Sequence, residues 1–108
     1  MKIVDEVKKK KEADKFYRDF LDFIKEKWKP EKVRDDYGYN TNIIRLYKKG
    51  RFFHKKIAVM AIDNYEKTIK VEVLDGYENY NNFRNLLKEF ERIRKGVKIT
   101  LFIKDYLY

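Results

Sequence analysis

The spacing of apolar residues switches period along this chain, and that pattern constrains the fold more than any single motif. Between residues 15 and 29 apolar side chains recur as they do on one face of an α-helix, and the same spacing returns between 79 and 95. Segments between 42 and 73, and again from 97 to 103, instead show strand patterns. The sequence therefore predicts helices and a sheet that share one core.

The first helix is predicted to run from about residue 3 to Trp28 or Lys29. Its apolar stripe consists of Phe16, Tyr17, Phe20, Leu21, Phe23, Ile24 and Trp28. Pro30 has no N–H to donate and disfavours helical geometry in the residue before it, so the helix should end there. A short strand from Lys2 to Val7 is the alternative for the N-terminal part, because the Lys8–Lys11 run interrupts the periodicity.

Three strands are predicted in the middle of the chain. Residues 42–47 are rich in β-formers, and Gly50 marks a tight reversal that leads into the segment 52–62. A second turn at 63–67 precedes the alternating pattern of 69–73. These strands should form an antiparallel meander, whereas residues 31–40 lack either periodicity and are predicted to be a loop.

The second helix should begin with Asn79 or Asn81 as its N-cap and end before Gly96, and a last strand should follow from Val97. The expected fold is a single α+β domain over residues 1–108 in the order α-β-β-β-α-β, with an antiparallel four-stranded sheet and two helices on one face. The other face should stay open. We expect it to carry Tyr47, Met60, Ile62 and Phe102 beside Arg45, Lys70, Lys98 and Lys104.

Composition excludes several kinds of chemistry. Cysteine and serine are absent, which removes disulfides, cysteine metal sites and Ser or Cys nucleophiles. The longest apolar run, 57–62, is far shorter than the roughly 20 residues of a membrane helix, so we expect a soluble, cytoplasmic protein without membrane partners. The abundance of Lys, Ile, Asn and Tyr is typical of an AT-rich genome, and the 42% charged residues fit a hyperthermophile or an archaeal virus.

Positive charge is concentrated in one segment. The chain has a net charge of +9, and residues 41–56 contribute six basic side chains and no acidic one. Interleaved rings complete a basic and aromatic pattern that suits phosphates and stackable bases. The candidate nucleic-acid-binding residues are Arg45, Tyr47, Lys48, Lys49, Arg51, Phe52, Phe53, His54, Lys55 and Lys56. The structural alternative is an ordinary solvated hairpin end in which one of Phe52 and Phe53 belongs to the core and the other covers an edge.

Other charged or titratable groups offer weaker candidates. Acidic neighbours surround the Lys8–Lys11 run, which favours a solvated helix face. His54 is the single histidine and has no carboxylate next to it in the sequence. Asp63, Glu72 and Asp75 are the only plausible metal-binding carboxylates, and they form no ordered pattern. We therefore assign no catalytic residue, no metal and no cofactor.

The basic β-meander after an N-terminal helix resembles the small ribonuclease toxins of the RelE class. The resemblance spans about residues 16 to 74 and is carried by Arg45, Tyr47, Lys48 and Arg51, which form no specific motif. It implies a metal-independent ribonuclease that uses Lys, Arg and Tyr. The segment 79–108 departs from that pattern.

The sequence is therefore consistent with three functions. The leading one is a non-catalytic protein that binds nucleic acid, with single strands favoured. The first alternative is a small viral-type inhibitor, such as an anti-CRISPR-like protein, that binds an anionic protein surface or a nucleoprotein complex of the host. The second is the toxin-type ribonuclease. A homodimer is a further expectation, provided that the stripe Phe16-Phe20-Phe23 is partly exposed.

Overall fold

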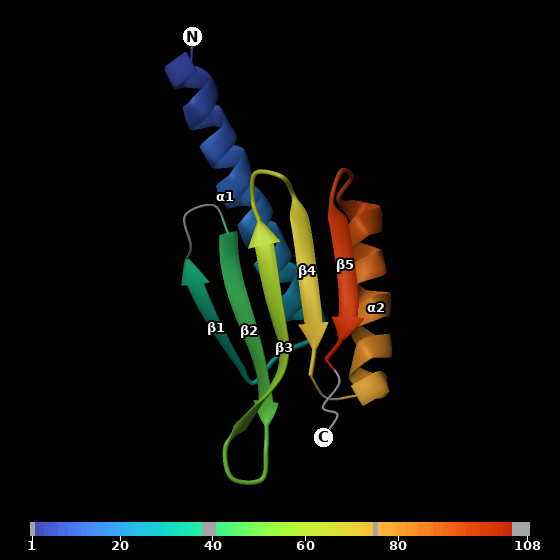
Figure 1. Ribbon diagram of the computed structural model, residues 1–108. Helices are drawn as coiled ribbons and strands as arrows, with labels where there is room; N and C mark the ends of the chain where they lie inside the picture. Colours follow the sequence, from blue (N-terminus) through green and yellow to red (C-terminus); the bar gives the residue numbers. More distant parts are fainter. Residues whose placement is uncertain (1, 38–40, 75, 105–108) are drawn as a thin grey trace.

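A five-stranded sheet forms the centre of the protein, and the computed structural model describes residues 2–37, 41–74 and 76–104. Its elements are α1 (Lys2–Lys27), β1 (Lys32–Tyr37), β2 (Thr41–Lys49), β3 (His54–Asp63), β4 (Thr68–Val73), α2 (Gly76–Ile93) and β5 (Lys98–Ile103). The strands lie side by side in chain order (Figure 1). Strands β1 to β4 are antiparallel, and β5 runs parallel to β4. The α+β class is thus confirmed.

The prediction of four strands was wrong, because the segment assigned to a loop contains β1. This strand pairs with β2 along its whole length, from Lys32 opposite Tyr47 to Tyr37 opposite Asn42. It lies at the edge of the sheet, where charged side chains protect unpaired backbone groups. Since Val33 is its single aliphatic residue, the segment shows no strand periodicity in the sequence. Residues 38–40, which the predicted loop also included, lie outside the described residues.

The prediction that every strand pair is antiparallel was also wrong. Helix α2 has 18 residues and connects the end of β4 to the start of β5. A helix of that length rises about 27 Å, which carries the chain back past the full length of β4. The next strand then starts at the same end of the sheet, so a parallel pair results.

Both helices pack on the same face of the sheet, as predicted. Phe90 of α2 meets the rings of Phe16, Phe20 and Phe23 of α1 at centroid distances of 6.4, 5.1 and 5.1 Å. These rings join the sheet side chains in one buried cluster. The stripe Phe16-Phe20-Phe23 is therefore buried within the protomer, and the observation on which the expected homodimer depended is absent.

Two residues expected on the open face point the other way. Met60 and Ile62 are fully buried against the helices, whereas their neighbours Val59 and Ala61 are partly exposed. All six residues from 57 to 62 are apolar, so the sequence carries no alternation that would set the phase. Pairing with β2 sets it instead, because Met60 lies opposite the buried Ile44.

The helix ends follow local chemistry. Trp28 donates its backbone N–H to the carbonyl of Ile24, and Lys29 adopts a φ of 52° before Pro30, which ends α1 as predicted. Gly96, with a φ of 87°, follows α2 in the position that glycine favours. Helix α2 begins at Gly76, so Asn79 lies inside the helix and the prediction of an N-cap at Asn79 or Asn81 was wrong.

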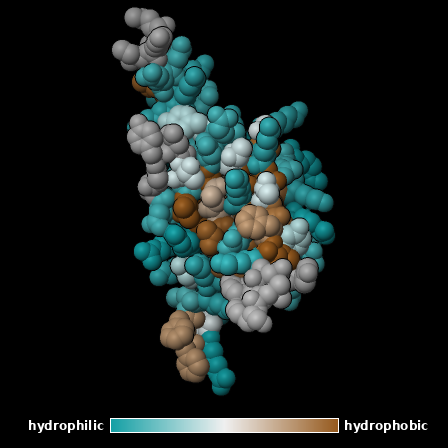
Figure 2. All heavy atoms as spheres, viewed as in Figure 1, coloured by the Kyte–Doolittle hydropathy of each residue, from teal (hydrophilic) through white to brown (hydrophobic). Residues whose placement is uncertain are grey.

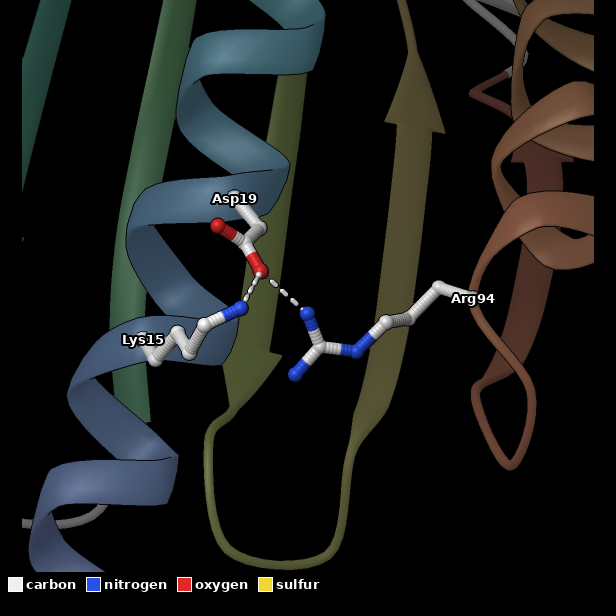
Figure 3. Close-up of polar contacts among 3 residues, drawn as sticks. All are labelled: Lys15, Asp19 and Arg94. Carbon is white, nitrogen blue, oxygen red and sulfur yellow. Dashed lines mark hydrogen bonds and ion pairs between the residues drawn. The ribbon is translucent and has the colours of Figure 1, made fainter.

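An ion-pair network joins the two helices. Asp19 of α1 accepts hydrogen bonds from Lys15 on the same helix and from Arg94 after α2 (Figure 3). Arg94 also lies over the ring of Phe16, with its guanidinium carbon 5.4 Å from the centroid. Burial by itself raises the pKa of Asp19, but the hydrogen bonds and positive charges of Lys15 and Arg94 outweigh it, so the pKa lies below its ordinary value of 3.8.

Because folding lowers the pKa of Asp19, the carboxylate stabilises the fold fully when the pH is above its ordinary pKa. This stabilisation is lost as the pH falls through the lowered pKa of the folded protein. We expect Asp19→Asn to lower the free energy of unfolding at neutral pH by at most about 1 kcal/mol, since the pair is partly exposed. The difference from wild type should shrink towards zero on acidification. Urea unfolding over a pH series measures it, with Asp22→Asn as control, and a difference that persists in acid would contradict the assignment.

Candidate nucleic-acid interface

The hairpin of β2 and β3 extends beyond both of its neighbouring strands. Strand β1 pairs with β2 only as far as Tyr47, and β4 pairs with β3 only from Ala58. Residues 48–56, which we call the hairpin tip, therefore have none of the other described strands beside them. In Figure 1 this tip projects from the lower end of the sheet. Its end, with Arg51, Phe52 and Phe53, is exposed to solvent.

Glycine at position 50 closes the tip. Its N–H donates to the carbonyl oxygen of Phe53 over 2.9 Å. A Cβ atom at this position would lie 2.4 Å from the same oxygen, which is closer than van der Waals contact allows. Only glycine fits here without a shift of the backbone, so the tight reversal predicted around Gly50 is confirmed.

The two phenylalanines of the tip are both exposed. Phe52 is 81% and Phe53 is 82% solvent-accessible, and their ring centroids are 6.4 Å apart. Neither belongs to the core and neither covers a sheet edge, so this part of the structural alternative was wrong. Two adjacent large apolar rings on a projecting turn contribute almost nothing to folding. Figure 2 shows apolar side chains at this lower end of the molecule, set apart from the apolar residues at the middle of the face.

The charges of the tip repel one another. Lys48 lies directly opposite Lys55, and Lys49 lies opposite His54. Like charges facing across an antiparallel pair destabilise a sheet. No carboxylate among the described residues forms an ion pair with Lys48, Lys49, Arg51 or Lys56. These four residues thus give the tip positive charge with little local compensation.

Aromatic rings accompany several of these cations. The guanidinium carbon of Arg51 lies 5.6 Å from the ring centroid of Phe52. At the base of the tip, the Nζ atom of Lys48 lies 4.7 Å from the ring centroid of Trp28. Such cation–π contacts hold a charge near a flat apolar face. A ligand with phosphates and flat rings finds both types of contact within one small surface.

The structure separates Arg45 from the other candidates. Arg45 lies in the middle of β2 and donates a hydrogen bond to the carboxylate of Asp36 on β1, so its charge is matched locally. Tyr47 occupies the base of the tip on the face opposite the helices. The structure brings the remaining candidates together in the tip: Lys48, Lys49, Arg51, Phe52, Phe53, His54, Lys55 and Lys56.

The carboxylates considered for a metal site have other positions. The Oδ1 atom of Asp63 accepts the backbone N–H groups of Tyr65 and Glu66 and so stabilises the turn between β3 and β4. Glu72 lies opposite Val59 near one end of the β3–β4 pair, whereas Asp63 lies opposite Thr68 at the other end. Asp75 lies outside the described residues. Within the described part of the chain, no three metal-binding side chains come together.

Comparisons with known proteins give no information on function, so the proposal below is based on the chemistry of the site. No family model, curated protein or solved structure matches this chain. The resemblance to ribonuclease toxins of the RelE class therefore depends on the sequence pattern alone. None of the helices described here is long and apolar enough to cross a membrane.

Sequence reasoning missed two residues beside the tip. Lys32 places its Nζ atom 5.7 Å from the ring centroid of Tyr47, which adds a cation to the base of the tip. It was overlooked because its segment was assigned to a loop. Trp28 was assigned only to the core, yet its ring contacts both Phe83 and Lys48. The position of Trp28 at the predicted end of the helix, two residues before Pro30, was the sequence feature that could have indicated this second contact.

Proposed function

We propose that the protein binds single-stranded nucleic acid through the hairpin tip and does not cleave it. The exposure of both Phe52 and Phe53 beside Lys49 and Arg51, which form no ion pair with a described carboxylate, carries this proposal. Lysine and arginine side chains neutralise phosphates, and unpaired bases stack on aromatic rings with about 1–3 kcal/mol per base. Each part of such a ligand therefore has a matching group on the tip.

The rings favour a single strand over a duplex. In a duplex the face of each base is covered by its neighbours, so stacking on Phe52 or Phe53 would first require unstacking, which costs a few kcal/mol per step. Bases of a single strand are available without this cost. The two centroids lie 6.4 Å apart with the ring planes tilted by 56°, so each ring offers a separate stacking surface.

The surroundings of His54 favour binding without catalysis. General acid–base cleavage of a phosphodiester requires a side chain that is oriented and poised to exchange a proton. His54 lies opposite Lys49 and next to Lys55, and no carboxylate among the described residues accepts a hydrogen bond from it. These contacts can hold a phosphate, but they do not orient a base.

Removal of three cations from the tip tests the proposal. For Lys48→Ala/Lys49→Ala/Arg51→Ala we expect weaker binding and a slope of log K against log salt that is shallower by about 2, because about 0.7 counterions per phosphate contact are released from a single strand. Fluorescence anisotropy with single-stranded and duplex DNA and RNA at several salt concentrations measures both quantities. Incubation of the wild type with labelled RNA in the same buffers tests for cleavage.

The matched control removes the same charge from α1. Lys8, Lys10 and Lys11 are exposed and lie near acidic residues, so Lys8→Ala/Lys10→Ala/Lys11→Ala should bind almost like wild type. Equal losses in the two triple variants would show that net charge, not the tip, controls affinity. If the wild type binds no nucleic acid, the proposal fails, and the tip's partner is then an anionic protein surface.

A further inference from the structure

The sheet face that the helices leave uncovered adjoins the tip. Figure 1 views the molecule from this side, with both helices behind the sheet. Because Ile44 and Leu46 point to the core, the residues between and after them point to the open face. Lys32, Tyr47 and Lys56 form one row across β1, β2 and β3. The same alternation places Lys49 on this side, so the basic surface continues from the tip onto the sheet.

The next row across the sheet ends in an exposed aromatic ring. It consists of Arg34, Arg45, Val59, Glu72 and Phe102 on the five successive strands. Phe102 is 42% exposed, while its chain neighbour Leu101 packs against the core and Ile103 is partly buried. Lys70 lies diagonally beside it, since it pairs with Thr100. Apolar side chains gather at the middle of this face in Figure 2, with hydrophilic ones around them.

Positive charge on the open face decreases with distance from the tip. The row of Tyr47 contains two lysines and no acidic residue, and the row of Phe102 contains two arginines and Glu72. Asp36, in the row after it, forms its ion pair with Arg45, and Lys70 lies in the same row as Asp36. A polyanion that starts at the tip is therefore attracted most strongly to the row of Tyr47, and it meets Arg34 and Lys70 further along the face.

We propose that a nucleic-acid strand held by the tip continues across the open face, over Tyr47, and stacks a further base on Phe102. This inference rests on the proposed function and extends it by naming the path of the strand. From the tip to the row of Phe102 and across to β5 the path measures roughly 30 Å, from about 3.3 Å per residue and about 4.8 Å per strand. The site then takes more nucleotides than the tip alone can contact.

Oligonucleotide length separates the two parts of the site. Fluorescence anisotropy is measured with oligothymidylates and oligouridylates of about 4 and about 12 nucleotides, within the range of known single-strand sites. We expect Phe102→Ala to weaken binding of the longer oligomer about 5-fold or more, which corresponds to the loss of one stacked base. Binding of the shorter oligomer, which fits on the tip, should not change.

Two controls keep this test decisive. Phe102→Tyr preserves a stacking ring and should bind the longer oligomer like wild type, which also shows that position 102 tolerates substitution. Tyr65→Ala removes a ring of similar exposure from the turn between β3 and β4 and should leave both affinities unchanged. Wild-type affinity of Phe102→Ala for the longer oligomer would overturn the proposed path while the tip remains a binding site. Failure of the wild type to bind either oligomer would overturn the proposed function itself.

Discussion

The double variant Phe52→Ala/Phe53→Ala should lose at least about 30-fold in affinity for a single-stranded oligonucleotide, since two stacked bases contribute about 2 kcal/mol or more. Its melting temperature should stay within a few degrees of wild type, because both rings are almost fully exposed and contact no core residue. Anisotropy titration at constant salt and a thermal melt by circular dichroism measure the two effects.

The comparison with Phe52→Tyr/Phe53→Tyr identifies the cause. Tyrosine keeps a ring of the same size, so stacking and most of the affinity should survive. The salt slope of Phe52→Ala/Phe53→Ala should match wild type, since no cation is removed. Full affinity in the alanine variant would show that the rings do not touch nucleic acid.

Phe90→Ala should have the largest effect on stability, lowering the free energy of unfolding by about 3–5 kcal/mol. Phe90 is almost completely buried and contacts Phe16, Phe20 and Phe23, so its loss leaves a cavity where α1 meets α2. Since small domains are stable by only about 5–15 kcal/mol, this is a large fraction of the total. Phe20→Ala should behave similarly.

Denaturant unfolding followed by tryptophan fluorescence and circular dichroism measures this loss, because Trp28 reports on the same core. Phe52→Ala serves as the matched control, since the same atoms are removed from an exposed position and stability should change by less than about 0.5 kcal/mol. A loss below about 1 kcal/mol in Phe90→Ala would contradict the packing of the two helices around this ring.

The helices, β4 and β5 were predictable because their apolar residues repeat with a clear period, and β2 and β3 because β-forming and apolar residues are concentrated in them. Edge strand β1 was not, since charged residues occupy most of it and the single aliphatic Val33 reveals no alternation. The uniformly apolar segment 57–62 likewise revealed a strand but not which side faces the core, and pairing with β2 decides that Met60 and Ile62 are buried. Local periodicity does not determine which side of such a strand faces the core.

The candidate site was predictable to the extent that its charges are adjacent in the sequence. The gathering of cations and rings between Lys48 and Lys56 is visible without a structure. Its projection is not, because it depends on where β1 and β4 stop pairing with β2 and β3. The salt bridge that compensates Arg45 was equally hidden, since its partner Asp36 belongs to the unpredicted strand.

Amide chemical-shift mapping tests most directly where a nucleic-acid strand binds. In ¹H–¹⁵N correlation spectra recorded during titration with an oligothymidylate of about 12 nucleotides, the largest shifts should fall on residues 48–56, followed by Tyr47 and Phe102. Residues of α1 and α2 on the far side of the sheet should change little. Shifts centred on the helices, or a spectrum that does not change at all, would contradict the assignment of the hairpin tip as the binding site.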